Sequence, residues 1–135
     1  MPYQGECLCG AVAFELQGEP FLYVICHCKN CKQAGGGAFM ANAFFEPQYV
    51  TVTKGKDSVK TYSDNKTKSG NAVFRSFCSN CGSPLFIGPA AGNITVVQAS
   101  NVNGSENWVP KKEFFAECKW GWVKELTFQP KKSKL

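Results

Sequence analysis

Seven of the eight cysteines stand in three short clusters, and these are the residues best able to do chemistry. The clusters are Cys7-Leu8-Cys9-Gly10, Cys26-His27-Cys28-Lys29-Asn30-Cys31 and Cys78-Ser79-Asn80-Cys81-Gly82. Thiolates two or three residues apart can converge on one tetrahedral ion, with zinc–sulfur bonds of about 2.3 Å. Glycine after Cys9 and Cys81 suits the tight turns that aim backbone N–H groups at the sulfurs. The spacing therefore predicts bound zinc.

Disulfides and a redox dithiol explain the clusters less well. Disulfides need an oxidising compartment, and the start of the chain, Met1 to Cys7, has neither the basic nor the apolar region of a secretory signal. Cysteines two residues apart are also awkward to bridge to each other. A thioredoxin-like pair belongs in a βαβ setting, which this strand-rich sequence does not provide.

Counting ligands divides the seven clustered cysteines into four and three. Cys26, Cys28 and Cys31 lie within six residues and can share one ion. The remaining two pairs come from distant parts of the chain: Cys7, Cys9, Cys78 and Cys81. Four thiolates make a closed structural site, whereas three thiolates and one exchangeable position are the pattern of a catalytic zinc. We therefore predict two Zn²⁺ per chain, one structural and one catalytic.

Two other residues are alternatives for a fourth ligand at the three-cysteine site. His27 is the only histidine, but in an extended segment its side chain points away from those of Cys26 and Cys28. We interpret it as a partly exposed ring or as a hydrogen-bond donor to one of the metal-ligating residues. Cys118 stands alone, and we favour a buried small apolar role for it, with metal ligation left open.

Three thiolates and one Zn²⁺ carry a net charge of −1, which weakens the ion as an acidifier of water. Such a site is better suited to exchanging a thiolate or alkoxide, as in the addition of a thiol to an aldehyde or its reversal. The glycines at 35–37 either admit a substrate and offer N–H groups to an oxyanion or form a mobile turn. Arg75, Lys54 and Lys66 could meet a substrate carboxylate, the alternative being solvated surface.

The elements that must position these residues read as short strands. The chain has 135 residues, of which 44% are hydrophobic, and this suits one compact domain. The candidate strands are 11–16, 39–45, 49–53, 72–77 and 94–98. Val12, Phe14 and Leu16 alternate onto one face of the first. At most a short helix follows Cys31 and stops at the glycines. The predicted fold class is mainly β.

Charge and targeting signals restrict the partners. The formal net charge of +5 indicates a solvated basic face or attraction of small anionic substrates. We expect no nucleic-acid partner, because no aromatic-and-basic motif stands out, and no membrane partner, because no apolar run is long enough. We expect a cytoplasmic protein. The Ser133-Lys134-Leu135 tripeptide matches the peroxisomal import address and would apply in a eukaryote.

The three clusters and their flanks, at 5–12, 26–31 and 74–83, resemble the glutathione-dependent formaldehyde-activating (Gfa/CENP-V) family over about residues 3–123. The resemblance implies a β-tent fold of several short coiled antiparallel sheets built around zinc. It implies one zinc domain at 1–125, followed by a basic tail at 126–135. It also implies the same division into a structural and a catalytic zinc, and carbon–sulfur lyase chemistry that interconverts formaldehyde plus glutathione with S-hydroxymethylglutathione.

Two departures from the family bear on the substrate. Relatives often end a small-residue turn in Asp where this chain has Ala99-Ser100-Asn101-Val102, and Cys118 is an added cysteine near Trp120. The alternative function is a non-catalytic β-tent zinc module that acts as a chaperone or interaction domain. A protein ligand at the fourth position of the second zinc would favour that alternative, whereas a pocket there would favour the enzyme.

Overall fold

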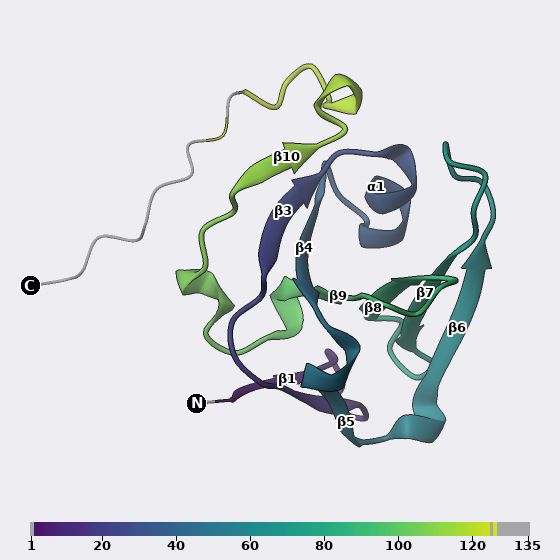
Figure 1. The fold of residues 1–135 in the computed structure, drawn as a ribbon, viewed down its shortest axis with the longest axis vertical. Coiled ribbons are helices and arrows are strands. Elements are labelled where there is room, and N and C mark those ends of the chain that lie inside the picture. Colours follow the sequence, from purple (N-terminus) through teal and green to yellow (C-terminus); the bar gives the residue numbers. More distant parts are fainter. Residues whose placement is uncertain (1, 125, 127–135) are drawn as a thin grey trace, which may run out of the picture.

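The computed structural model describes residues 2–124 and residue 126. It is mainly β, as predicted, and holds two sheets (Figure 1). The small sheet has the antiparallel order β1 (Tyr3–Glu6), β2 (Ala13–Leu16) and β5 (Val50–Lys54). The large sheet has the order β10 (Lys112–Phe114), β3 (Leu22–Cys26), β4 (Met40–Phe45), β9 (Thr95–Gln98), β8 (Pro84–Pro89), β7 (Val73–Cys78) and β6 (Val59–Asp64).

The five strands predicted from the sequence are present as β2, β4, β5, β7 and β9, and the other five were not predicted. Within the large sheet β10 pairs with β3 in parallel, an exception to the antiparallel pattern that the family resemblance implies. Short 3-10 turns join the strands: Pro47–Tyr49, Lys56–Ser58, Ala99–Asn101, Ser105–Asn107 and Ala116–Cys118. Residues 127–135, with most of the predicted basic tail and its Ser133-Lys134-Leu135 signal, lie outside the described residues.

The main core lies between the two sheets. Val12, Phe14 and Leu16 are fully buried, which confirms the predicted apolar face of the first strand. From the large sheet they meet Ala43, Phe45, Leu85 and Val97. Burying this much apolar surface is the principal source of stability, and it fixes β4 between the core and the site described below.

Strand β4 serves two environments because successive side chains of a strand point to opposite faces. Ala43 and Phe45 belong to the main core. Met40 lies on the other face and packs with Cys26 and Cys31 in a second, smaller cluster. The alternation of one strand thus connects the core to the three-cysteine cluster.

Helix α1 (Lys29–Gly35) begins before Cys31, one turn earlier than the sequence predicted. Cys28 is its N-cap, and the Cys28 sulfur accepts a hydrogen bond from the Cys31 backbone N–H at 3.3 Å. Gly36 ends the helix in the left-handed conformation, and the N–H groups of Gly36 and Gly37 both donate to the Lys32 carbonyl. These glycines form a helix cap, so the interpretation that they offer N–H groups to an oxyanion is wrong.

Gly55 is the glycine whose replacement should cost most by steric overlap. It has φ +75°, and a Cβ there would overlap the backbone carbonyl oxygen of Ala11. Gly55→Ala is expected to lower the free energy of unfolding by about 3 kcal/mol, combining left-handed strain with overpacking. Gly70→Ala is the matched control, because Gly70 has φ +78° but nothing within 4 Å of the added atom. Equal losses in thermal unfolding of the two variants would contradict the overlap.

No helix among the described residues is long and apolar enough to cross a membrane.

Candidate metal centres

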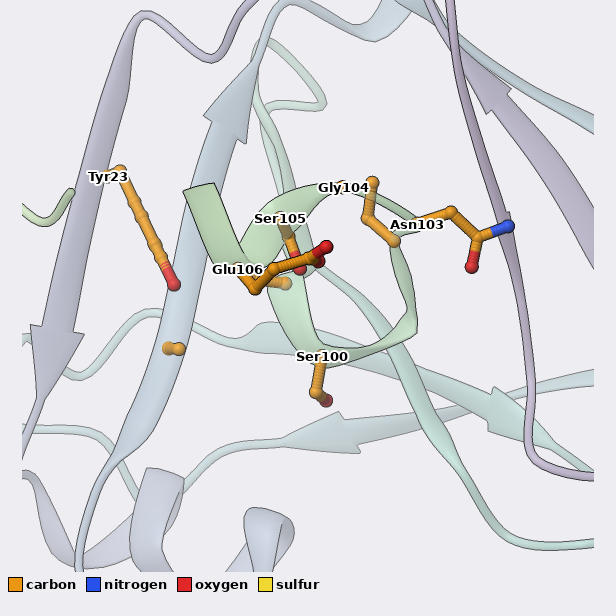
Figure 2. A pocket seen from close by; sticks show the side chains of 9 residues that line it. Tyr23, Ser100, Asn103, Gly104, Ser105 and Glu106 are labelled. Carbon is orange, nitrogen blue, oxygen red and sulfur yellow. The ribbon is translucent and has the colours of Figure 1, made fainter. Parts of the chain in front are cut away.

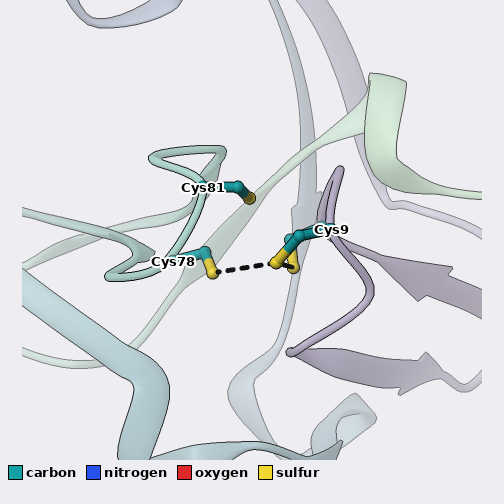
Figure 3. Close-up of side chains that lie close together, drawn as sticks. Cys9, Cys78 and Cys81 are labelled. Atoms are coloured by element: carbon teal, nitrogen blue, oxygen red, sulfur yellow. Dashed lines mark hydrogen bonds between the residues drawn. The ribbon is translucent and has the colours of Figure 1, made fainter.

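Four cysteines from two segments far apart in the sequence lie close together (Figure 3). The sulfurs of Cys7, Cys9, Cys78 and Cys81 all lie within 4.8 Å of one another. Cys7 and Cys9 are 3.6 Å apart and Cys9 and Cys78 are 3.8 Å apart, and all four thiols are free. Zinc–sulfur bonds of 2.3 Å at tetrahedral angles place sulfurs about 3.8 Å apart. This donor set therefore fits a zinc ion and can hold a metal.

Two glycine turns build this cluster. The backbone N–H of Gly10 donates to the Cys7 carbonyl, and that of Gly82 donates to the Cys78 carbonyl. Both glycines are in the left-handed conformation, with φ of +77° and +78°. The predicted turns are thus confirmed. The backbone N–H of Val12 is 3.3 Å from the Cys7 sulfur, and donors of this kind stabilise a thiolate.

Side chains complete the hydrogen bonding of the four-cysteine cluster. The Asn80 amide donates to the Cys9 sulfur at 3.2 Å and is the main cause of a lowered pKa at Cys9. The Ser83 hydroxyl lies 3.1 Å from the Cys81 sulfur and, with the Ser83 backbone, lowers the pKa of Cys81 to about 5. These contacts favour the deprotonated form that a metal requires.

The second cluster joins the end of β3 to the start of α1. Its sulfurs, from Cys26, Cys28 and Cys31, lie within 4.8 Å of one another, with Cys26 and Cys28 at 3.5 Å. The hydrogen bond from Cys26 is the main cause that lowers the pKa of Cys28 to about 2. Among the described residues no further His, Cys, Asp or Glu joins the group. The spacing again fits a metal, with three protein ligands.

The Cys31 sulfur has polar neighbours brought from other strands. Both terminal nitrogens of Arg75 on β7 lie 3.9 Å from it, and the Asn42 amide on β4 lies 3.8 Å from it. Asp64 holds the Arg75 guanidinium through Nε at 3.0 Å and also accepts from Asn30 at 2.8 Å. Arg75 is 15% exposed, so its interpretation as solvated surface is wrong.

A cavity of about 380 Å³ opens onto the three cysteines. One wall is a row of the large sheet, in which Arg75, Ile87, Val96 and Phe44 are consecutive cross-strand neighbours. Lys66 and Lys68 stand at the cavity and bring positive charge, whereas Lys54 contacts the Gly10 carbonyl elsewhere. The cavity is therefore apolar along Ile87, Val96 and Phe44 and cationic at Arg75 and the two lysines.

A second cavity, of about 560 Å³, lies beside the 3-10 turns at 99–107 (Figure 2). It is lined by Tyr23, Ala41, Ala99, Ser100, Val102, Asn103, Gly104, Ser105 and Glu106. Ala41 faces it from the side of β4 opposite to Asn42. With one carboxylate and no cysteine among its lining residues, it has no comparable ligand set.

Comparison with known proteins identifies the family. The model of the glutathione-dependent formaldehyde-activating enzyme family matches residues 2–118. The chain belongs to this family. A Halomonas elongata protein named as a glutathione-dependent formaldehyde-activating enzyme is 34% identical to this chain over 64% of its residues. The matched part spans only 56% of the length of the Halomonas protein. A Schizosaccharomyces pombe protein named as an uncharacterised lyase is 30% identical over 78% of the chain and 72% of its own length.

A crystal structure of a Rhodobacter sphaeroides protein has the same fold. It superimposes with a TM-score of 0.59 at 20% identity, covering 75% of this chain and 88% of that one. At this identity the likeness concerns the fold alone. The loops that carry the four cysteines and the β3–α1 junction of this chain are therefore part of a fold that a solved structure shares.

His27 has a different role from either predicted one. Its ring is fully buried, and Nε2 lies 2.8 Å from a carboxylate oxygen of Glu113 on β10. The same carboxylate pairs with Lys119 at 2.9 Å. The predictions of a partly exposed ring and of a donor to a ligand are both wrong. His27 instead ties β10, and the segment that follows it, to β3.

Cys118 is half-buried in the wall of the three-cysteine cavity. Its sulfur lies 3.8 Å from the Lys68 ammonium and does not join the group of three sulfurs. The interpretation of Cys118 as a buried apolar residue is therefore wrong. Cys118 thus lines the cavity without belonging to the group of three.

The Asp64–Arg75 pair is expected to contribute strongly to stability, because Asp64 is only 8% and Arg75 15% exposed. Asp64→Ala leaves a buried guanidinium without its carboxylate and removes one of the two acceptors of the Asn30 amide, the other being the Lys66 carbonyl, at a cost of about 3 kcal/mol. The thermal midpoint should fall by about 10 °C. Glu117→Ala is the control, because the Lys68–Glu117 pair is 67% exposed on both sides and should contribute almost nothing. A similar, small change in both variants would contradict the prediction.

Proposed function

We propose that this chain is a zinc-dependent carbon–sulfur lyase that forms or cleaves thiol–aldehyde adducts such as S-hydroxymethylglutathione. The observation that carries the proposal is a group of three cysteine sulfurs, without a fourth protein ligand among the described residues, at the base of a cavity. Cys26, Cys28 and Cys31 would hold the catalytic zinc. The structural zinc would be held by Cys7, Cys9, Cys78 and Cys81, within a domain at 1–125.

The reaction is an addition that balances without an oxidant. The thiol sulfur forms a bond to the aldehyde carbon, the C=O π electrons move to oxygen, and that oxygen takes up the proton released by the thiol. A zinc ion at the three cysteines would supply Lewis acidity toward the thiol and the carbonyl. Arg75 places positive charge beside Cys31, which offsets part of the negative charge of three thiolates.

The cavity supports a small anionic thiol as the substrate. Lys66 and Lys68 are placed to attract the carboxylates of a peptide thiol, and the two relatives bear names of a formaldehyde-activating enzyme and a lyase. The apolar wall that includes Val96 and Ile87 would limit water around the reacting groups. A non-catalytic zinc module would need neither the cavity nor its lysines.

The proposal is tested by the rate at which formaldehyde and glutathione interconvert with S-hydroxymethylglutathione, measured by magnetisation-exchange NMR. Zinc-loaded protein should raise this exchange rate well above the uncatalysed rate. Protein stripped of metal by a chelator should not. Equal rates with and without zinc-loaded protein, across several thiols and aldehydes, would overturn the proposal.

A further inference from the structure

Asn42 is a polar residue on an otherwise apolar strand face. Its neighbours on that face of β4 are Met40, which packs with Cys26 and Cys31, and Phe44, which lines the cavity. Asn42 itself is 5% exposed and also lines the cavity. Burying an amide in such surroundings is unfavourable unless its polar atoms find partners.

Only one end of the Asn42 amide has a partner within the protein. Nδ2 lies 3.8 Å from the Cys31 sulfur, and the nitrogen must face that atom because a thiolate accepts hydrogen bonds. Oδ1 has no hydrogen-bond partner. Gln98, directly opposite on β9, does not supply one: its amide nitrogen donates to Ser100 at 3.3 Å and makes no hydrogen bond to Asn42, and its own Oε1 is also without a partner. A carbonyl oxygen is therefore left buried and unpaired.

The position of this unpaired acceptor indicates what would satisfy it. Oδ1 is buried and belongs to the same planar amide whose nitrogen contacts the Cys31 sulfur, and the Asn42 side chain is one of those that line the cavity. An amide oxygen accepts hydrogen bonds and cannot donate. A ligand that completes the site must therefore bring an O–H or N–H donor to this point, and leaving the oxygen unpaired costs about 1–3 kcal/mol.

We propose that Asn42 binds the hydroxyl group of the adduct, with Oδ1 accepting from the O–H of the S–CH₂–OH unit. This inference rests on the proposed function. It assigns Asn42 as a substrate-binding residue that distinguishes hydroxymethyl thioethers from S-alkyl thioethers of the same size. The hydroxyl proton is the one that must reach sulfur when the carbon–sulfur bond breaks, so Asn42 would hold the reacting end of the adduct.

The test compares two ligands by calorimetric titration of the zinc-loaded protein. One is S-hydroxymethylglutathione, formed by mixing glutathione with excess formaldehyde, and the other is S-ethylglutathione, in which a methyl group replaces the hydroxyl. The wild type should bind the hydroxymethyl adduct about tenfold more tightly, the value of one hydrogen bond. Asn42→Leu, an apolar residue of similar size, should bind both ligands equally. Asn103→Leu, an exposed residue in the other cavity, should keep the preference.

A preference absent from the wild type, or kept by Asn42→Leu, would overturn the inference. Should the leucine variant lose metal, the NMR signal of the Asn42 side-chain carbonyl carbon in the wild type gives the same test. It must shift with the hydroxymethyl adduct and stay unchanged with S-ethylglutathione. A preference that depends on Asn42 in a protein without lyase activity would sink the proposed function alone. Lyase activity without such a preference would sink the Asn42 assignment alone.

Discussion

Cys28→Ser is expected to lower the metal content from two zinc ions per chain to one and to reduce lyase activity by about a thousandfold or more. The Cys28 sulfur lies 3.5 Å from that of Cys26 and accepts from the Cys31 N–H at 3.3 Å, so it is central to the group of three. Two remaining thiolates would hold the ion weakly. Elemental analysis per chain and the NMR exchange rate measure the two effects.

The design of this variant separates metal loss from unfolding. Cys28 is the N-cap of α1, and serine is among the best N-cap residues, so the helix should persist and the circular dichroism spectrum should not change. Cys118→Ser is the matched control, because Cys118 lines the same cavity but its sulfur stands apart from the group. That variant should keep both ions. One ion lost from Cys118→Ser and none from Cys28→Ser would refute the division into four and three.

Local chemistry made the clusters and half of the strands predictable. The cysteine spacing and the glycines that follow can be recognised within a few neighbouring residues. Strand β2 shows a clear alternation of buried side chains through Phe14 and Leu16. Among the missed strands, β3 does carry an apolar run with β-branched and aromatic residues, LYVIC, whereas three others lack a clear signal. β8 begins and ends with proline, β6 is an edge strand with the polar sequence VKTYSD, and β1 holds Gly5 against the ring of Phe14. Their pairing depends on partners elsewhere in the chain.

The polar surroundings of the second cluster were less accessible to prediction because they arise from long-range contacts. His27 meets Glu113, 86 residues away, and Arg75 meets both Cys31 and Asp64 only after β6 and β7 pair. Asn42 did leave a local signal. It occupies an alternate position between Met40 and Phe44 in the run MANAFF, and a polar residue at an intended core position of a strand indicates a function.

Cys9→Ser is expected to lower the thermal midpoint by about 15 °C or more, the largest stability effect of the variants considered. Cys9 lies between Cys7 and Cys78 in the four-cysteine group, with its sulfur 3.6 Å and 3.8 Å from theirs. Its side chain is exposed, so the substitution buries no new hydroxyl and the loss reports the metal alone. Structural zinc contributes about 10–16 kcal/mol of binding free energy in zinc-finger peptides, and much of it should appear here as folding stability.

We expect the two clusters to differ in their effect on the thermal midpoint because they join different parts of the chain. The four-cysteine group ties the β1–β2 loop to the β7–β8 turn, about 70 residues later, and so links the small sheet to the large one. The group of three lies within residues 26–31 and joins segments that are already adjacent. Wild-type protein stripped of metal should therefore melt like Cys9→Ser, and Cys28→Ser should melt near the wild type. A midpoint for Cys9→Ser within a few degrees of the wild type would mean that core packing alone holds the sheets together.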